Sequence, residues 1–530
     1  MMKYLPPALA FFLHISSGTL AIAGGVSFDS LIKAQIYETA EWKNLLHYSG
    51  GRSVIDSQSS FFLSDTGYKD PKAEYVETIR QMLDSKLKDG DSIQCRYPAR
   101  VNLIMEQSGV SVKELPAQKC AEFEEYEKKV PFDEVYVVFA AENNTSPTSM
   151  MGHTFLKISG ANDAGPREHS FSYFAALDNT SMAKFLYRAI TFGIEGIYAL
   201  SPYKIKRQEY LINQNRSLWE FKLNLNEAEK YKLKNHLWEL RNKFIRYSLI
   251  THNCNTALVG VLKTADADFD ESTIKPFSTP VEYIQELSQK NRISEISFEP
   301  TGTGQKIIDK HGLNYILSAP EPTRLAISYE YSDNNYLRME FNPIYQDLRD
   351  VSDAYFDELE SKLLNFSARM NLESGRFVLD AFDLIKIKSI PDFTISDSFA
   401  KHFKISFEND LYDDATRLRP TAEFGLGLGL HAGHFKIYAI PTVGYRYSDF
   451  NNFYFTPEIG IISRITDYLK FMSSYKYYFN TNGDNRGYDS VFQAYLGYRL
   501  FRNKELSFEY LKYAGDAAHI AYRAGFTIHF

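Results

Sequence analysis

One cysteine is the first candidate for chemistry in this chain. The sequence holds three cysteines, Cys95, Cys120 and Cys254, and in an oxidising compartment an odd count leaves one thiol to react or to pair between molecules. Cys254 precedes a short apolar run, 257–262, that is typical of the first turns of a buried helix. Because N–H groups and the helix dipole favour an anion there, we expect a lowered pKa for this thiol.

A histidine at the start of a strand supplies a second reactive group. His153 opens the segment 153–158, whose apolar run predicts a strand. An imidazole paired with a thiolate that attacks an acyl carbonyl is the papain-type arrangement. Here the histidine precedes Cys254, the reverse of papain's order, but such sites are recognised by geometry and roles rather than by chain order. His252 is the alternative base, although its place in the same loop as the cysteine favours a supporting role.

The elements around these two residues predict an α+β domain over 130–300. A continuous β-branched and aromatic run at 135–141 predicts a buried strand, and further strands are expected at 170–176 and 219–225. Asn226, with an acidic residue three positions on, predicts the capped start of a helix. A sheet and a helix of one domain would therefore present the histidine and the cysteine.

The preceding region, 24–129, predicts a helical periplasmic domain. Helices are expected at 28–48 and 71–88, and Cys95 and Cys120 are expected to form a disulfide. A disulfide that closes a loop of this size stabilises a domain by roughly 3 kcal/mol. A metal site is not expected at this pair, because further thiol or histidine partners are lacking nearby.

Residues 1–23 have the features of a secretory signal peptide. A lysine at position 3 is followed by an apolar stretch, 5–20, and by Ala21-Ile22-Ala23, a small-x-small cleavage pattern. No later segment contains the run of about 20 apolar residues that a membrane-spanning helix needs. The formal net charge of −7 argues against a nucleic-acid partner.

The segment 323–530, after a linker at 301–322, predicts an antiparallel transmembrane β-barrel. Alternating apolar and polar residues recur in about twelve short runs, and insertions such as 345–357 would connect them. A barrel turns the apolar face toward lipid and keeps a polar lumen. The last run places these residues on one face: Ile520, Tyr522, Ala524, Phe526, Ile528 and Phe530. The alternative is a water-soluble β-rich domain such as a lectin-like sandwich.

The terminal Phe530 resembles the C-terminal aromatic signal that the barrel assembly machinery reads in bacterial outer membrane proteins. An even number of strands would also return both ends of the barrel to the periplasm. We therefore expect the Gram-negative outer membrane as the location, with the N-terminal domains in the periplasm.

Several strings resemble the periplasmic domain of the Lnb family, which is named for a lipoprotein intramolecular transacylase. The founding activity moves an acyl chain from the diacylglyceryl group of a lipoprotein to the amino group of its N-terminal cysteine. The resemblance implies a circularly permuted papain-like thiol domain, followed in Gram-negative members by a C-terminal barrel. The strings are Met151-Gly152-His153-Thr154-Phe155-Leu156, Ser172-Tyr173-Phe174-Ala175-Ala176, Phe192-Gly193-Ile194-Glu195-Gly196, Glu209-Tyr210, Arg216-Ser217-Leu218-Trp219-Glu220 and Asn253-Cys254.

The resemblance also implies roles for single residues. His153 matches the family's histidine and Cys254 its cysteine, as base and nucleophile. A third, orienting residue is expected on the strand after the histidine, where His169 is favoured over Ser172 and Tyr173. Asn253 and Tyr173 are expected beside the reacting groups, and backbone N–H groups at the cysteine would form the oxyanion site.

Three classes of function remain open on the sequence. The first is a thiol acyl enzyme acting on lipid or lipoprotein acyl groups, for which Met150, Met151, Phe155 and Phe174 favour an apolar groove. The second is a peptidoglycan amidase or peptidase, which needs the same thiolate, base and oxyanion donors. The third is a non-catalytic outer membrane binding or channel protein.

No cofactor is expected in any of these three classes. The expected partners are outer membrane lipids, a lipoprotein or peptidoglycan substrate, and the barrel assembly machinery.

Overall fold

In the computed structural model the chain consists of two compact units. One consists of the residues up to Lys129 with Tyr231–Ile245, and the other of Val130–Lys230 with Arg246–Phe530. The expected signal peptide lies outside the described residues, among which no helix is long and apolar enough to cross a bilayer. The structure describes residues 27–55, 59–141, 152–176, 184, 188–189, 191–249, 251–270, 279–301, 308, 312–351, 358–391, 393, 399–410, 416–447, 451–480, 488–515 and 518–530.

The first unit is built from short helices. The helix expected over 28–48 is divided, because Gln35 adopts a left-handed φ of 52° and Thr39 is extended and caps the next helix. The helix expected over 71–88 ends at Met82. The elements are α1 (Phe28–Lys33), η1 (Ile36–Glu38), α2 (Ala40–Leu45), β1 (Tyr48–Ser49), β2 (Arg52–Ser53), α3 (Pro71–Met82), η2 (Asp89–Asp91), α4 (Ile93–Arg96), α5 (Pro98–Ser108), η3 (Val112–Glu114), α6 (Ala121–Lys129) and most of α9 (Glu227–Leu240).

A buried arginine organises the core of this unit. Arg100 is fully buried, and its guanidinium lies 4.2 Å from the ring centroid of Phe61 and 4.3 Å from that of Tyr97. It donates to Glu74 at 2.6 Å, and its backbone N–H donates to Glu239 at 3.0 Å. Cys95 and Cys120 form a disulfide in the same unit.

The second unit begins with a seven-stranded sheet of order β8-β6-β5-β4-β3-β7-β9. Strand β3 lies between β4 and β7 and is buried along most of its length. Asn226 and Glu229 cap each other at the start of α9, as expected, with N–H to carboxylate and N–H to amide oxygen distances of 2.8 and 3.0 Å. The elements are β3 (Glu134–Ala140), β4 (His153–Asn162), β5 (Gly165–Ala175), β6 (Ile194–Pro202), α8 (Tyr203–Arg207), η4 (Gln208–Asn213), β7 (Leu218–Leu223), β8 (Phe244–Tyr247), α10 (Cys254–Leu262), η5 (Ala267–Phe269), α11 (Pro280–Gln289), β9 (Ile293–Glu299) and η6 (Leu313–Ser318).

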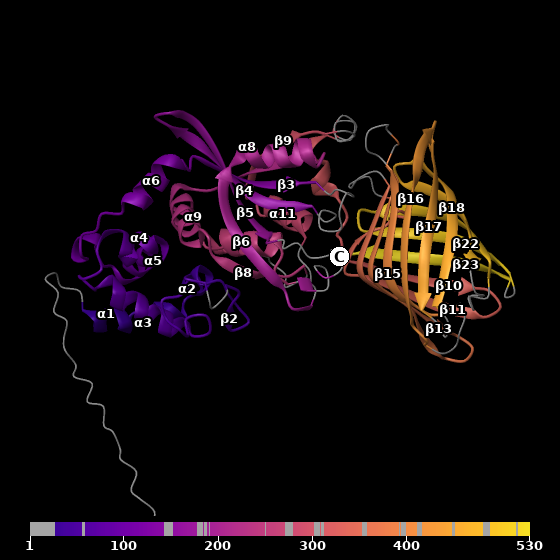
Figure 1. The fold of residues 1–530 in the computed structure, drawn as a ribbon, viewed down its shortest axis with the longest axis horizontal. Coiled ribbons are helices and arrows are strands. Elements are labelled where there is room, and N and C mark those ends of the chain that lie inside the picture. Colours follow the sequence, from indigo (N-terminus) through magenta and orange to yellow (C-terminus); the bar gives the residue numbers. More distant parts are fainter. Residues whose placement is uncertain are drawn as a thin grey trace, which may run out of the picture. The chain divides into compact units, whose positions relative to one another are not determined.

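The segment from Arg324 to His529 forms a closed antiparallel barrel (Figure 1). The first strand pairs with the last, β10 with β23, and β11 pairs with β13 to close the sheet. Because β12 continues β11 and β20 continues β19, the wall has twelve strands, which confirms the expected count. The strands are β10 (Arg324–Tyr331), β11 (Asn335–Asn342), β12 (Ile344–Gln346), β13 (Leu359–Asn371), β14 (Phe377–Ser389), β15 (Ala400–Glu408), β16 (Arg419–Ala432), β17 (Phe435–Tyr447), β18 (Asn451–Thr466), β19 (Leu469–Tyr477), β20 (Phe479–Asn480), β21 (Ser490–Phe501), β22 (Lys504–Ala514) and β23 (His519–His529).

The two faces of the barrel wall differ in polarity. Along β17, Ile437 and Val443 are exposed on the outside, while Lys436 and Arg446 are buried in the interior. The interior holds a cavity of about 350 Å³ that is lined mainly by charged and polar side chains. An apolar outer face around a polar lumen is the arrangement of an outer membrane barrel rather than of a water-soluble sandwich.

Candidate active site

Cys254 occupies the first turn of α10 and is buried. Asn253 caps this helix, because its side-chain oxygen accepts from the N–H groups of Asn255 and Thr256 at 2.9 and 3.1 Å. Two of the first-turn donors are therefore occupied by the cap. The cap does not use the backbone N–H of Cys254, which is another donor at the helix start.

The start of β4 meets the start of α10 at the thiol. The backbone N–H of Thr154 donates to the Cys254 sulfur, and α10 packs against β4 and β5. Burial nevertheless raises the pKa of the Cys254 thiol, against the opposing effects of Thr154, the Arg216 charge and the Asn255 N–H. The expectation of a lowered pKa is therefore wrong, because desolvation of the thiolate outweighs the donors at the helix start.

His153 lies beside Thr154, at the first position of β4. Its ring stacks on Phe155, with centroids 5.9 Å apart, and lies 6.1 Å from the ring of Tyr210. Burial lowers the pKa of His153 to about 3, assisted by the charges of Arg216 and Lys206. The imidazole is therefore neutral at pH 7, and so is the thiol.

Two residues outside the predicted set are shared neighbours of the histidine and the cysteine. The charge of Arg216 acts on both His153 and Cys254. Burial is the main cause of the raised pKa of the Tyr210 phenol, and a negative charge on the nearby Cys254 sulfur adds to the rise. The Arg216 guanidinium is buried, lies 5.1 Å from the centroid of the Tyr210 ring and donates to the carbonyl oxygens of Ala140 and Ala141 at 2.7 and 2.6 Å. Both residues lie in sequence segments that resemble the Lnb family, and this resemblance was the sequence feature that could have indicated a role for them.

Two glycines of those strings have steric roles. Gly152 has a φ of +76°, and a Cβ there would lie 2.2 Å from the ring of Phe139. A Cβ on Gly196 would lie 2.4 Å from the hydroxyl oxygen of Tyr173. Glycine at these positions lets the chain pass close to β3 ahead of His153 and makes room for the Tyr173 phenol.

The three candidates for the orienting residue occupy different places on β5. His169 pairs with Ile158 on β4, four residues or about 13 Å along the strand from Tyr173. Tyr173 lies near the thiol. Burial is the main cause of the raised pKa of the Tyr173 phenol, and the neighbouring Tyr198, Tyr247 and Cys254 add to the rise. Ser172 is buried on the opposite strand face from Tyr173, the face that also carries His153. The structure thus brings Tyr173 to the thiol and does not bring His169 there.

The remaining residues named from the sequence differ in their surroundings. His252 lies in the loop before α10, with its ring nitrogen 3.0 Å from the hydroxyl of Thr251. Phe155 is buried, whereas Phe174 is 37% exposed. Met150 and Met151 lie outside the described residues.

The central domain is similar to a known family of periplasmic domains. Residues 122–290 match the family model described as the Lnb N-terminal periplasmic domain. Residues 34–107 and 319–520 match two models described as domains of unknown function, DUF7843 and DUF7840. No curated protein matches the chain.

Solved outer membrane proteins are similar to the barrel. The KdgM porin in complex with disordered oligogalacturonate is 12% identical, covers 39% of this chain and 99% of its own, and has a TM-score of 0.25. Acinetobacter baumannii Omp33 is 13% identical, with coverages of 40% and 100% and a TM-score of 0.25. Outer membrane phospholipase A from Escherichia coli is 9% identical, with coverages of 39% and 90% and a TM-score of 0.26.

The polarity of the barrel and the family match together give the location. The barrel has an apolar outer face and a charged interior, and the preceding domain matches a periplasmic family. The chain is thus an outer membrane barrel protein whose Lnb-type domain lies in the periplasm.

Proposed function

We propose that the Lnb-type domain is a cysteine acyl enzyme that acts on lipid or lipoprotein acyl groups. Cys254 would be the nucleophile and His153 the general base. The observation that carries the proposal is the convergence of two chain segments, in which the N–H next to His153 donates to the Cys254 sulfur and the Arg216 charge acts on both residues. A nucleophile, a base and a nearby fixed positive charge are the parts that acyl transfer needs.

The reaction would start from a neutral thiol and a neutral imidazole. As the sulfur attacks the ester carbonyl carbon, the thiol proton moves to His153 and the carbonyl oxygen becomes the oxyanion. Collapse of this intermediate breaks the carbon–oxygen bond, and His153 returns the proton to the leaving alcohol. The resulting thioester would then be attacked by an amine or by water, which gives acyl transfer or hydrolysis and regenerates the thiol.

The Arg216 charge favours the anions of this reaction, the thiolate and the oxyanion, and disfavours the imidazolium form of His153. The N–H of Cys254 at the start of α10 would donate to the oxyanion, and the buried Arg216 guanidinium is held by two backbone carbonyls. A preorganised cation costs no reorganisation when negative charge develops beside it. Arg216 is therefore proposed as the residue that stabilises the thiolate and the oxyanion.

An acyl substrate is favoured over a peptide by the groups around the dyad. Phe155, Tyr203 and Tyr210 form an aromatic cluster at the histidine, with Phe155 stacked on Tyr210 at 5.7 Å between centroids. The barrel of the same chain would keep the domain near the membrane, which raises the local concentration of lipid substrates without any new contact.

The test is covalent labelling of the detergent-purified full chain with a lipid-tailed and a peptide-tailed electrophilic probe. We expect labelling that prefers the lipid tail, disappears in Cys254→Ala and falls at least about 100-fold in His153→Ala, as loss of a general base does. His252→Ala is the matched control and should label like the wild type. Preference for the peptide tail would instead assign an amidase, and an inert Cys254 would assign a binding protein.

A second pair of variants decides the orienting role. Because Ser172 shares the strand face of His153 and His169 does not, Ser172→Ala should slow labelling of Cys254 more than His169→Ala. The reverse order would return the role to His169. A Tyr173→Phe variant reports whether the phenol beside the thiol contributes.

A further inference from the structure

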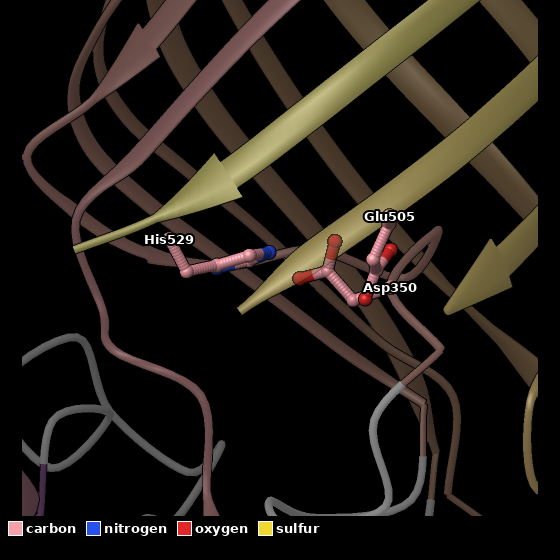
Figure 2. Close-up of side chains that lie close together, drawn as sticks. All are labelled: Asp350, Glu505 and His529. Carbon is pink, nitrogen blue, oxygen red and sulfur yellow. The ribbon is translucent and has the colours of Figure 1, made fainter. Parts of the chain in front are cut away.

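Three metal-ligating side chains meet inside the barrel, far from the thiol domain in sequence. Asp350 follows β12, Glu505 is the second residue of β22, and His529 is the last residue of β23. One ligand atom of each lies within 4.8 Å of those of the other two. Figure 2 shows the imidazole of His529 directed toward the two carboxylates, at the end of the barrel where the chain enters β10 and leaves β23.

The cluster is shielded from solvent. The exposed fractions of Asp350, Glu505 and His529 are 7%, 2% and 2%. Two carboxylates placed side by side at such burial repel each other and lose hydration, so they require a cation or a proton. Exposed acidic clusters do not carry this requirement.

Two cationic side chains of this part of the barrel are paired with other carboxylates. Arg324 donates to Glu340 at 2.9 Å, and Lys470 donates to Glu358 at 2.8 Å. Among the residues that the structure describes, Glu505 forms no ion pair with a lysine or arginine; the backbone N–H of Val351 donates to it at 3.2 Å. Among the described residues, no direct ion pair therefore neutralises this carboxylate.

The tautomer of His529 fits a metal ligand. Its Nδ1 lies 3.2 Å from the backbone carbonyl oxygen of Glu321, and because a carbonyl only accepts, Nδ1 carries the proton. This leaves the lone pair on Nε2. A metal-bound histidine typically donates its other N–H to a backbone carbonyl or carboxylate in this way. The cluster thus presents one imidazole lone pair and two carboxylates, which are all acceptors.

We propose that Asp350, Glu505 and His529 bind one divalent transition-metal ion of the Zn²⁺ type. One imidazole nitrogen and two carboxylate oxygens suit such ions, whereas Ca²⁺ and Mg²⁺ prefer oxygen ligands alone. A site with three protein ligands would keep a position for water or another ligand.

The ion would join a lumenal loop to the last two strands. The loop carrying Asp350 runs into the barrel, where Leu348 packs with Ile390 and Tyr438. A metal that links Asp350 to β22 and β23 would hold this loop inside the lumen. Its removal should loosen the loop and leave the wall hydrogen bonds in place.

The test is metal binding by the full chain in detergent, purified with a tag that contains no histidine and stripped with EDTA. Co²⁺ serves as the spectroscopic probe and Zn²⁺ as its competitor, with bound metal counted by mass spectrometry. We expect one ion per chain, and an affinity that falls in Asp350→Asn and His529→Gln by more than the roughly 10- to 100-fold that loss of an outer-shell partner costs.

His519→Gln is the matched control, because His519 lies at the opposite end of the same strand and stacks on Tyr513. This variant should bind Co²⁺ like the wild type. Heat-modifiable migration in gels checks that each barrel is folded, and Asp350→Asn decides the result if His529→Gln does not fold, since Asp350 is not in a strand.

Two results would overturn the proposal. Stripped wild-type protein that takes up no Co²⁺ would mean that the two carboxyl groups share a proton instead. Binding that survives in both Asp350→Asn and folded His529→Gln, or that is lost in His519→Gln, would place the metal elsewhere. Because the readout is metal content, these results do not depend on the activity of Cys254.

Discussion

The pH dependence of Cys254 alkylation separates two kinds of thiol site. Burial raises the pKa of the thiol above its ordinary value and lowers that of His153 to about 3, so both groups are neutral at pH 7. Well below the thiol pKa, each pH unit lowers the thiolate fraction tenfold. The rate of alkylation should therefore fall about 100-fold from pH 8 to pH 6.

A thiolate–imidazolium pair of the papain type would behave differently. Its thiol pKa of about 3–4 keeps the sulfur ionised throughout this range, so the rate would change little with pH. The assay is stopped-time labelling with iodoacetamide on the full chain in detergent. Cys254→Ser gives the background, because the other two cysteines are joined in a disulfide.

Variants of Arg216 test the electrostatic part of the same reasoning. Its charge opposes the rise in the thiol pKa, so Arg216→Gln should slow alkylation at every pH between 6 and 8, while Arg216→Lys, which retains the charge, should slow it less. A rate that is flat between pH 6 and pH 8 in the wild type would refute the neutral pair. Equal rates for the two variants would remove the charge as the cause.

Two further predictions concern the first unit. Arg100→Met leaves the buried side chains of Glu74 and Glu239 without their cation and should destabilise this unit by about 3–5 kcal/mol. Arg80→Met removes an exposed ion pair and should destabilise it by less than about 1 kcal/mol. Tryptophan fluorescence during urea unfolding measures both changes. Burial raises the pKa of Glu239 to about 7, so the folded unit binds a proton more tightly than the unfolded chain. The melting temperature should therefore fall as pH rises from 5 to 8, and a pH-independent difference between wild type and Glu239→Gln would contradict this.

Local patterns were sufficient for much of the fold. The twelve barrel strands follow from alternation along each strand, because a period of two sets which side chains face lipid whatever the neighbouring strand contains. The start of α9 follows from Asn226 and Glu229, which cap each other within one turn. The division of the segment 28–48 was not predicted, because the left-handed backbone conformation occurs at Gln35 and not at a glycine, the residue that usually indicates it.

The candidate site was only partly visible in the sequence. His153 and Cys254 could be named from residue type and from their places at a strand start and a helix start. Their shared neighbours, Arg216 and Tyr210, come from other elements, and the preference for His169 could not account for strand register. The four-residue offset between His169 and Tyr173 is decided by how β5 pairs with β4.

The sequence by itself determined the classes of element and the reactive residue types, because both depend on side chains a few positions apart. Only the tertiary structure decided the protonation states at Cys254 and His153, since these depend on how much water packing excludes. It also brought together Asp350, Glu505 and His529. These residues are 155 and 24 positions apart (505 minus 350, and 529 minus 505), so no local sequence pattern could predict their contact. The convergence of these three residues depends on the closure of the barrel, which involves all of its strands at once.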